Sequence, residues 1–163
     1  MILRVFLIYL CSGMLLTSNG SALATPQENP IKWSLAVKSR AYKAGDKFTA
    51  RLTAQIAAGW HLYALEEVPN GPRPTRITLV AQQPFGLSGN IEAPKPITKF
   101  DENFGVETPY YEKAVTFKLS FKIKPEAKPG KTTMVVQTRY QVCNEQMCLP
   151  PKTVKVAAAI AIK

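Results

Sequence analysis

The stretch Phe48-Thr49-Ala50-Arg51-Leu52-Thr53-Ala54-Gln55-Ile56 alternates strictly between apolar and polar side chains. Because successive side chains of an extended strand point to opposite faces, this alternation predicts a strand with one buried face. The same period of two recurs over 115–123, 134–142 and 154–162, and shorter strands are predicted over 33–37, 60–63 and 76–81. No stretch of the sequence carries the sustained 3.6-residue apolar stripe of a helix.

The predicted strands are separated by turn-forming residues such as Pro69-Asn70-Gly71-Pro72 and Pro129-Gly130. Short strands punctuated in this way are typical of an antiparallel β-sandwich. We therefore predict one all-β domain over residues 25–163, with an immunoglobulin-like antiparallel β-sandwich fold. The segment Gln82–Tyr111 differs, because it is rich in proline, glycine and aromatic residues, and it is predicted to be a long loop.

The first residues have the three-part layout of a secretory signal peptide. A positive start over Met1–Arg4 is followed by an apolar stretch, Val5–Leu16, and then by small residues at Ala22 and Ala24. The apolar stretch is too short to span a membrane comfortably. We expect residues 1–24 to be a signal peptide cleaved after Ala24, and the mature protein to lie outside the cytoplasm without stable membrane insertion.

The chain has 163 residues and carries 21 Lys+Arg against 11 Asp+Glu, a formal net charge of +10. Such an excess is compatible with nucleic acid, an anionic membrane surface or acidic proteins as partners. The lysines are scattered singly, however, and the sequence has no nucleic-acid-binding motif. We therefore interpret the charge as a basic, solvated surface and expect no nucleic acid partner. The single histidine, His61, excludes most metal enzymes that use several histidines.

Two of the three cysteines, Cys143 and Cys148, lie in the predicted domain and enclose Asn144-Glu145-Gln146-Met147. In an oxidising compartment, two thiols this close are expected to pair. Closing so short a loop contributes only about 2 kcal/mol by the chain-entropy estimate, which favours an accessible redox couple over a strong staple. A structural staple stays open as an alternative, and so does a Cu(I) site that includes Met147. Zinc is disfavoured because the ligand set is thin, and no metal site is assigned.

Four segments of the sequence occur together in a recognisable order. They are Gly59-Trp60-His61-Leu62-Tyr63, Glu92-Ala93-Pro94-Lys95-Pro96, Lys99-Phe100-Asp101-Glu102-Asn103-Phe104-Gly105 and Tyr140-Gln141-Val142-Cys143-Asn144-Glu145-Gln146-Met147-Cys148-Leu149-Pro150-Pro151. Together they resemble the family of DsbD amino-terminal periplasmic domains, which belong to a thiol:disulfide interchange protein of bacterial envelopes. The resemblance covers nearly all of residues 30–162, and the last segment is its most specific part.

The resemblance implies an immunoglobulin-like fold and a redox pair, Cys143 and Cys148, that cycles between dithiol and disulfide. It also implies a cap loop that shields this pair, with Phe104 as the shielding ring. The residues that match the cap loop are Asp101, Glu102, Asn103, Phe104 and Gly105.

Three further residues are expected to support the site. Tyr63 matches a tyrosine near the cysteines of the family, whereas His61 stands where the well-known members have a second tyrosine. Glu145, together with the acidic residues of the cap loop, is expected to disfavour thiolate formation. The sequence departs from the best-known example in having four residues, not five, between the cysteines.

These implications predict periplasmic thiol–disulfide exchange, in which the cysteine pair relays electrons from a membrane or thioredoxin-like reductant to oxidised envelope proteins. The expected partners are thioredoxin-like envelope proteins and a separate membrane electron donor of the DsbD type, and no cofactor is expected. The protein would then be an electron carrier of the thiol:disulfide oxidoreductase type, not an autonomous turnover enzyme. Two alternatives stay open: an immunoglobulin-like binding or adaptor module with a structural disulfide, and a Cu(I)-handling protein.

Overall fold

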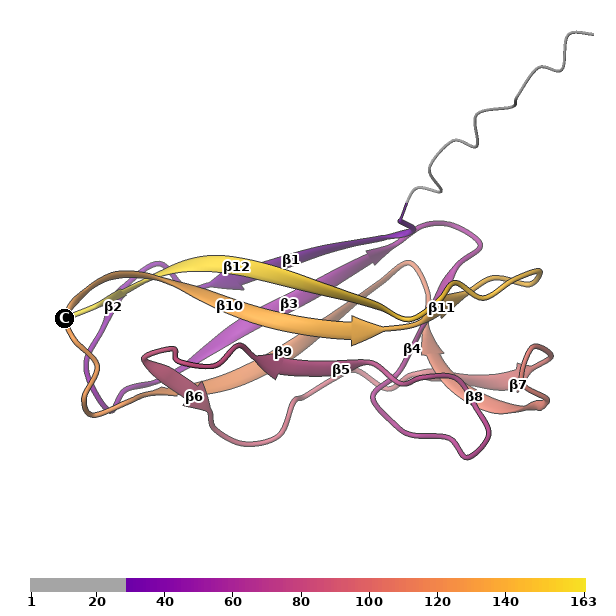
Figure 1. Cartoon of the computed structure of the whole chain (residues 1–163), viewed down its shortest axis with the longest axis horizontal. Helices are drawn as coiled ribbons and strands as arrows, with labels where there is room; N and C mark the ends of the chain where they lie inside the picture. The colour runs from indigo at the N-terminus through magenta and orange to yellow at the C-terminus, as the bar shows by residue number, and fades with distance from the viewer. Residues whose placement is uncertain (1–28) are drawn as a thin grey trace, which may run out of the picture.

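The computed structural model describes residues 29–163, so the predicted signal peptide, residues 1–24, lies outside the described part of the chain. Residues 29–163 form strands and no helix, and therefore contain no helix with the length and hydropathy of a membrane span. The strands, shown in Figure 1, are β1 (Ile31–Val37), β2 (Ala41–Tyr42), β3 (Lys47–Ile56), β4 (His61–Tyr63), β5 (Arg76–Leu79), β6 (Phe85–Leu87), β7 (Ile97–Asp101), β8 (Val106–Tyr111), β9 (Ala114–Ile123), β10 (Gly130–Tyr140), β11 (Val142–Cys143) and β12 (Lys152–Ile162).

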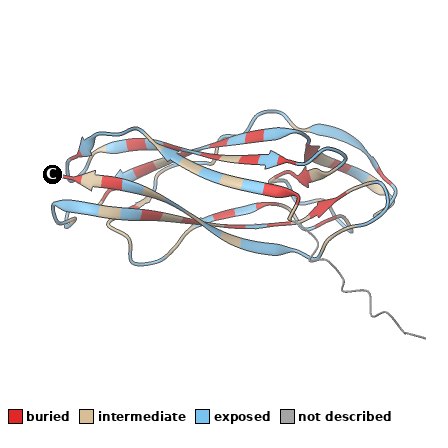
Figure 2. Cartoon of the chain, turned by 90° about the horizontal axis from the view of Figure 1, so that it is seen from above, coloured by how far each residue is buried: buried red, intermediate tan, exposed pale blue. Residues whose placement is uncertain are grey.

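Two four-stranded sheets form the body of an elongated sandwich (Figures 1 and 2). The first sheet has the order β1-β3-β9-β6, and the second has the order β2-β12-β10-β5. Their pairings are antiparallel except for that of β2 with β12. Buried and exposed residues alternate along the long strands (Figure 2), which confirms the strands predicted from the period of two. The fold is the predicted all-β, immunoglobulin-like sandwich.

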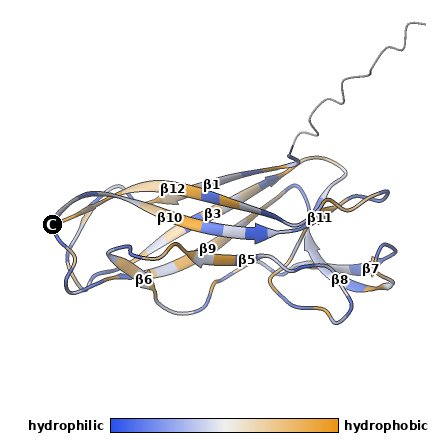
Figure 3. Cartoon of the chain, viewed as in Figure 1, coloured by the Kyte–Doolittle hydropathy of each residue, from blue (hydrophilic) through white to orange (hydrophobic). Residues whose placement is uncertain are grey.

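The core between these two sheets is aliphatic and aromatic. Leu52 of β3 lies directly opposite Phe117 of β9, and both belong to one cluster with Met134 and Val136 of β10. All four side chains are almost completely buried. Burying a side chain of this kind stabilises a fold by about 1.5–3 kcal/mol. In Figure 3 hydrophobic residues accordingly lie on the strands of both sheets, including the short β5 and β6.

A third sheet of four short strands, in the order β11-β4-β8-β7, closes one end of the sandwich (Figure 1). After β10 the chain passes from the second sheet into the third at Gln141, whose side chain accepts a hydrogen bond from Arg73 N–H and donates one to the Leu149 carbonyl. The predicted single strand over 134–142 is therefore wrong at its end. Tyr140 belongs to the second sheet and Val142 to the third. Both are buried, so their alternation with Gln141 does not reveal the change of sheet.

The prediction of a long loop over Gln82–Tyr111 is also wrong, because the segment contains β6, β7 and β8. β6 extends the first sheet beside β9, and β7 and β8 form an antiparallel hairpin of the third sheet. Pro109 lies within β8, and its carbonyl accepts a hydrogen bond from Ala64 N–H just beyond the end of β4. The nitrogen of Pro109 faces the same side as its carbonyl, where β4 has already ended. The missing N–H therefore costs no hydrogen bond with β4, and proline is compatible with this strand.

Candidate functional site

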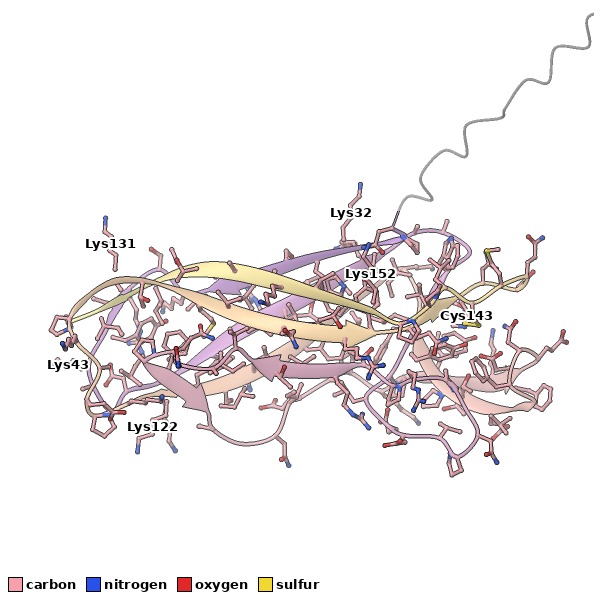
Figure 4. All side chains as sticks on the ribbon, in the orientation of Figure 1. Lys32, Lys43, Lys122, Lys131, Cys143 and Lys152 are labelled. Carbon is pink, nitrogen blue, oxygen red and sulfur yellow. A yellow bond between two sulfur atoms is a disulfide. The ribbon has the colours of Figure 1, made fainter. Side chains whose placement is uncertain are left out.

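Cys143 and Cys148 form a disulfide at the end of the molecule that holds the third sheet (Figure 4). Cys143 lies in β11 and pairs in register with His61 of β4. Asn144 organises the turn between the two cysteines. Its main-chain N–H donates to the Met147 carbonyl, and its side-chain Oδ1 accepts from the main-chain N–H groups of Gln146 and Met147 at 2.9 and 2.8 Å. These hydrogen bonds within the turn fix the conformation of the segment between the two cysteines.

The two cysteines differ in their access to solvent. Cys143 is 0% exposed and packs in a cluster with Tyr63 and Tyr110, whereas Cys148 is half-buried at the edge of that cluster. Cys148 is therefore the member of the bridge that lies nearer to solvent.

The carboxylate of Asp101 is buried beside this cluster and is held by three donors. The Tyr63 hydroxyl donates to Oδ2 at 2.6 Å, and the Thr108 hydroxyl donates to the same oxygen at 3.3 Å. The main-chain N–H of Asn103 donates to Oδ1 at 3.0 Å. A buried carboxylate is tolerated when its oxygens are satisfied in this way, so these bonds also fix the end of the β7–β8 hairpin.

His61 extends this network toward solvent. Its Nε2 lies 3.1 Å from the Tyr63 hydroxyl and 3.8 Å from Asp101 Oδ2. Because the single hydroxyl proton of Tyr63 goes to Asp101, the contact with Tyr63 requires His61 Nε2 to donate. The His61 ring also packs against Tyr110, with 4.6 Å between ring centroids.

Two pKa values in this network are shifted. Burial lowers the pKa of His61 below its ordinary value, against the opposing negative charges of Asp101 and Glu112. Burial also raises the pKa of Tyr63, and its hydrogen bond to Asp101 and the charge of that carboxylate raise it further. The two shifts favour a neutral His61 and a protonated Tyr63 near neutral pH, so the Tyr63 hydroxyl remains a donor to Asp101.

The predicted cap-loop residues form the turn of the β7–β8 hairpin. The main-chain N–H groups of Phe104 and Gly105 donate to the Asp101 carbonyl at 3.2 and 2.8 Å. Gly105 has a φ of 69°, in the left-handed region that glycine adopts without strain. Phe104 packs against the cluster that contains both cysteines, with its ring edge-on to Tyr63 at 6.0 Å between centroids. Phe104 thus lies at the edge of the cluster that contains Cys143.

A groove with a volume of about 740 Å³ runs beside the disulfide turn. Its aromatic lining consists of Trp60, Phe100 and Tyr110. The exposed side chain of Asn103 donates to the Asn144 carbonyl at 3.5 Å, which links the hairpin turn to the disulfide turn within the groove. The charged residues in the lining are Asp101, Glu102, Glu112 and Glu145 together with Lys99 and Lys113, so the groove is acidic on balance.

The structure brings the sequence-predicted site residues to one end of the molecule. Cys143, Tyr63 and Asp101 are buried there, whereas Glu102 and Glu145 are exposed along the groove. Within residues 29–163 there is no group of three or more His, Cys, Asp or Glu side chains arranged to hold a metal ion.

Sequence reasoning missed several members of the site. Thr108 and Tyr110 share one face of β8, but the intervening Pro109 obscured their period of two. Asn144 acts through hydrogen bonds from main-chain N–H groups two and three residues ahead, a local turn that asparagine favours, so its residue type could have indicated it. Glu112 carried no signal in the sequence, because its effect on His61 depends on strand pairings that are not local.

Residues 27–160 match the family described as "Thiol:disulfide interchange protein DsbD, N-terminal". Among solved structures, the chain is similar to the DsbD N-terminal domain of Neisseria meningitidis in the reduced form, with a TM-score of 0.55 and 18% identity over 85% of this chain and 91% of that chain. It is also similar to the N-terminal periplasmic domain of ScsB from Proteus mirabilis, with a TM-score of 0.55 and 15% identity over 85% of this chain and 49% of that chain. No curated protein matches the chain in sequence.

These structures share the sandwich fold with the chain, and the family match spans most of its length. The protein therefore belongs to the family of DsbD amino-terminal domains.

Proposed function

We propose that the protein relays electrons in the periplasm by thiol–disulfide exchange at Cys143 and Cys148. Family membership supports thiol–disulfide exchange in general. The observation that carries the proposal is the asymmetry of the bridge, in which Cys143 is fully buried and Cys148 is half-buried, with a groove along the turn that joins them. A disulfide with a purely structural role requires neither a neighbouring groove nor a difference in solvent access between its two cysteines.

In the reductive half, a thiolate of the electron donor attacks Cys148 Sγ. A mixed disulfide forms, and Cys143 leaves as a thiolate that takes up a proton. The second thiol of the donor then attacks its own sulfur in the mixed disulfide and releases Cys148. Two electrons and two protons have moved, the donor is oxidised to a disulfide, and both cysteines of this chain are reduced. The oxidative half reverses these steps with an oxidised envelope protein.

The surroundings of the pair favour thiols over thiolates in the reduced state. Burial of Cys143 disfavours its charged form, and the buried Asp101 adds a negative charge nearby. The exposed carboxylates of Glu102 and Glu145 act in the same direction with more screening by solvent. The resting reduced protein is thereby protected from adventitious oxidation.

The hairpin turn over Asp101–Gly105 serves as the cap. Its Phe104 ring packs against the cysteine cluster, and its Asn103 side chain donates a long hydrogen bond, 3.5 Å, to the Asn144 carbonyl of the disulfide turn. A partner that displaces this turn gains access to Cys148. The partners we propose are thioredoxin-like envelope proteins and a separate membrane electron donor.

The reduction potential of the Cys143–Cys148 bridge tests the function. A value between about −180 and −270 mV, measured by equilibration with glutathione and thioredoxin buffers, is expected for an exchange protein. A value well below about −300 mV would instead assign the bridge to a structural role and favour the adaptor alternative. Stoichiometric uptake of Cu(I) by the reduced protein would favour the copper alternative.

Single-cysteine variants test the direction of attack. Reduced Cys143→Ala, which keeps Cys148, is expected to form a mixed disulfide rapidly with an aromatic disulfide reagent. Cys148→Ala is the matched control and should react far more slowly, because its remaining thiol is buried. Equal rates would contradict attack at Cys148 but would leave the reduction potential as a separate test.

Replacing Phe104 by alanine tests the cap. Removal of the ring is expected to raise the reactivity of the reduced protein toward small disulfides severalfold, because the cysteine cluster loses its cover. Phe100→Ala is the matched control, since Phe100 lies on the same hairpin but is 63% exposed. An unchanged rate in Phe104→Ala would remove the shielding role.

A further inference from the structure

The end of the sandwich opposite the disulfide gathers lysines that are scattered singly in the sequence. We define the basic end by Lys43, Lys47, Lys122, Lys124, Lys128 and Lys131. In Figure 4, Lys43, Lys122 and Lys131 lie at one end of the long axis, and Cys143 lies toward the other.

Strand pairing and turn contacts bring these lysines together. Lys47 at the start of β3 is the direct register partner of Lys122 near the end of β9. Gly45 N–H donates to the Ile123 carbonyl at 3.1 Å, and Ile123 N–H donates to the Asp46 carbonyl at 2.9 Å. Lys43 lies in the turn between β2 and β3, Lys124 and Lys128 lie on the connection from β9 to β10, and Lys131 lies at the start of β10. The end of β12 pairs with both β10 and β2, which brings these segments to the same end.

The protein leaves this positive charge unneutralised. Within residues 29–163, no salt bridge involves any of the six lysines. The acidic side chains at this end are Asp46 and Glu126, and Asp46 Oδ2 accepts from the main-chain N–H of Lys43 at 2.9 Å. Like charges directly opposite each other in an antiparallel pair are destabilising, and Lys47 and Lys122 are such a pair.

The composition of the basic end indicates what it binds. Specific protein interfaces and single-stranded nucleic acid sites depend on arginine forks and aromatic anchors. Within residues 29–163, the large hydrophobic side chains that are exposed are Leu87, Ile97, Phe100 and Met147. Phe100 is the aromatic residue among these four, and it lies on β7, which carries none of the six lysines. Lysine is a hydrated point charge on a flexible stem and needs no fixed geometry in its partner. These properties suit a fluid array of phosphate groups.

We propose that the basic end binds the anionic phospholipid headgroups of a membrane surface electrostatically and without insertion. Bound in this way, the molecule holds its disulfide and groove at the end directed away from the membrane, free to meet other proteins. The proposal does not depend on the redox function, and either can fail without the other.

Vesicle binding tests the proposal. The purified protein is expected to co-sediment with phosphatidylcholine vesicles that contain about 30% phosphatidylglycerol, but not with phosphatidylcholine alone. The binding should weaken steeply between about 50 and about 300 mM salt, because surface charges are screened over this range. Equal binding to both kinds of vesicle would indicate apolar attachment and would overturn the proposal.

A pair of matched variants locates the binding surface. Each lysine near an anionic membrane is worth about fivefold in affinity, so Lys43→Gln with Lys131→Gln should weaken binding about 30-fold. Lys32→Gln with Lys152→Gln removes the same charge elsewhere on the sandwich (Figure 4) and should leave binding within about twofold. Denaturation curves of both variants verify that they are folded.

Three outcomes would overturn the assignment. Equal losses in the two double variants would mean that overall charge, not the basic end, drives the binding. Binding of polyglutamate with the same salt dependence and the same response to the variants would instead indicate an acidic protein partner. The same behaviour with a short DNA duplex would indicate a general polyanion site.

Discussion

The core of the sandwich and the core of the third sheet are both buried, but they are built from different chemistry. In the sandwich, side chains such as Leu52 and Phe117 pack without any polar partner. In the third sheet, Tyr63 and Cys143 form the buried cluster, and the Asp101 carboxylate lies against it. The first core stabilises the fold through buried apolar area, whereas the second holds polar groups that are stable only as a complete hydrogen-bonded set.

Because of this difference, the sandwich core mainly determines the stability of the fold, whereas the polar core mainly determines the surroundings of the disulfide. The long strands that form the sandwich core end before the disulfide turn. Gln141 joins the last residue of β10, in the second sheet, to β11 of the third sheet. A change in one core should therefore leave the main property of the other intact.

The largest effect is expected in the sandwich core. Phe121→Ala should lower the free energy of unfolding by about 3–5 kcal/mol, because its fully buried ring, which packs on Phe48 and Phe85, would leave a cavity between the sheets. The reduction potential of the disulfide should move by less than about 10 mV. Denaturant titration and equilibration with glutathione measure the two quantities, and a potential shift above about 30 mV would show that the cores are coupled.

The next effect is expected in the polar core. Tyr63→Phe removes a 2.6 Å hydrogen bond to a carboxylate and should destabilise the protein by about 1.5–3 kcal/mol. Tyr42→Phe is the matched control, since Tyr42 is equally buried but donates to the neutral Lys38 carbonyl, and it should cost about 1 kcal/mol. Equal losses in thermal or chemical unfolding would mean that the charge of Asp101 adds nothing to the third sheet.

Reduction of the Cys143–Cys148 bridge is expected to cost about 2 kcal/mol, because the bridge closes a short loop. Unfolding curves recorded with and without a thiol reductant measure the difference. A loss above about 4 kcal/mol would be typical of a bridge that constrains a whole domain, and it would favour the structural alternative over an exchange couple.

The smallest effect is the pH dependence that His61 contributes. Its pKa is lowered in the folded protein, so folding favours the neutral ring. Below the ordinary value of 6.5, the unfolded chain binds the proton more readily than the folded one, and stability is lost as the pH falls from 6.5 toward the folded pKa.

Comparison of the protein with His61→Gln isolates this contribution. The unfolding free energy of the unsubstituted protein should fall more than that of the variant between about pH 7.5 and about pH 5.5. A gain in stability on acidification would instead mean that the attraction of Asp101 and Glu112 for a charged ring outweighs the effect of burial.

The parts of the fold that could be predicted are those with local signals. Alternation along 48–56 and 115–123 arises from the pleat of a single strand, so it identified β3 and β9 without knowledge of their pairing. The proximity of Cys143 and Cys148 follows from their short separation in sequence. The family resemblance correctly pointed to the immunoglobulin-like fold.

The parts that could not be predicted depend on contacts between distant segments. Asp101 is buried only because β7 and β8 fold against β4, which brings Tyr63 and Thr108 to its carboxylate. In the sequence, Asp101 is one acidic residue in a segment that reads as a loop. Similarly, apolar and polar residues alternate without interruption from β10 of the second sheet, across Gln141, into β11 of the third sheet. The sequence therefore does not show that the chain changes sheets at Gln141.

Strand periodicity and short-range pairing are local properties of the chain, so the sequence already indicates an all-β sandwich with a cysteine pair in one short turn. The tertiary structure is needed to see which cysteine is fully buried, which carboxylate is buried, and which lysines share one end. These depend on strand register and on the closing of the third sheet, which join residues dozens of positions apart, and no local pattern records them.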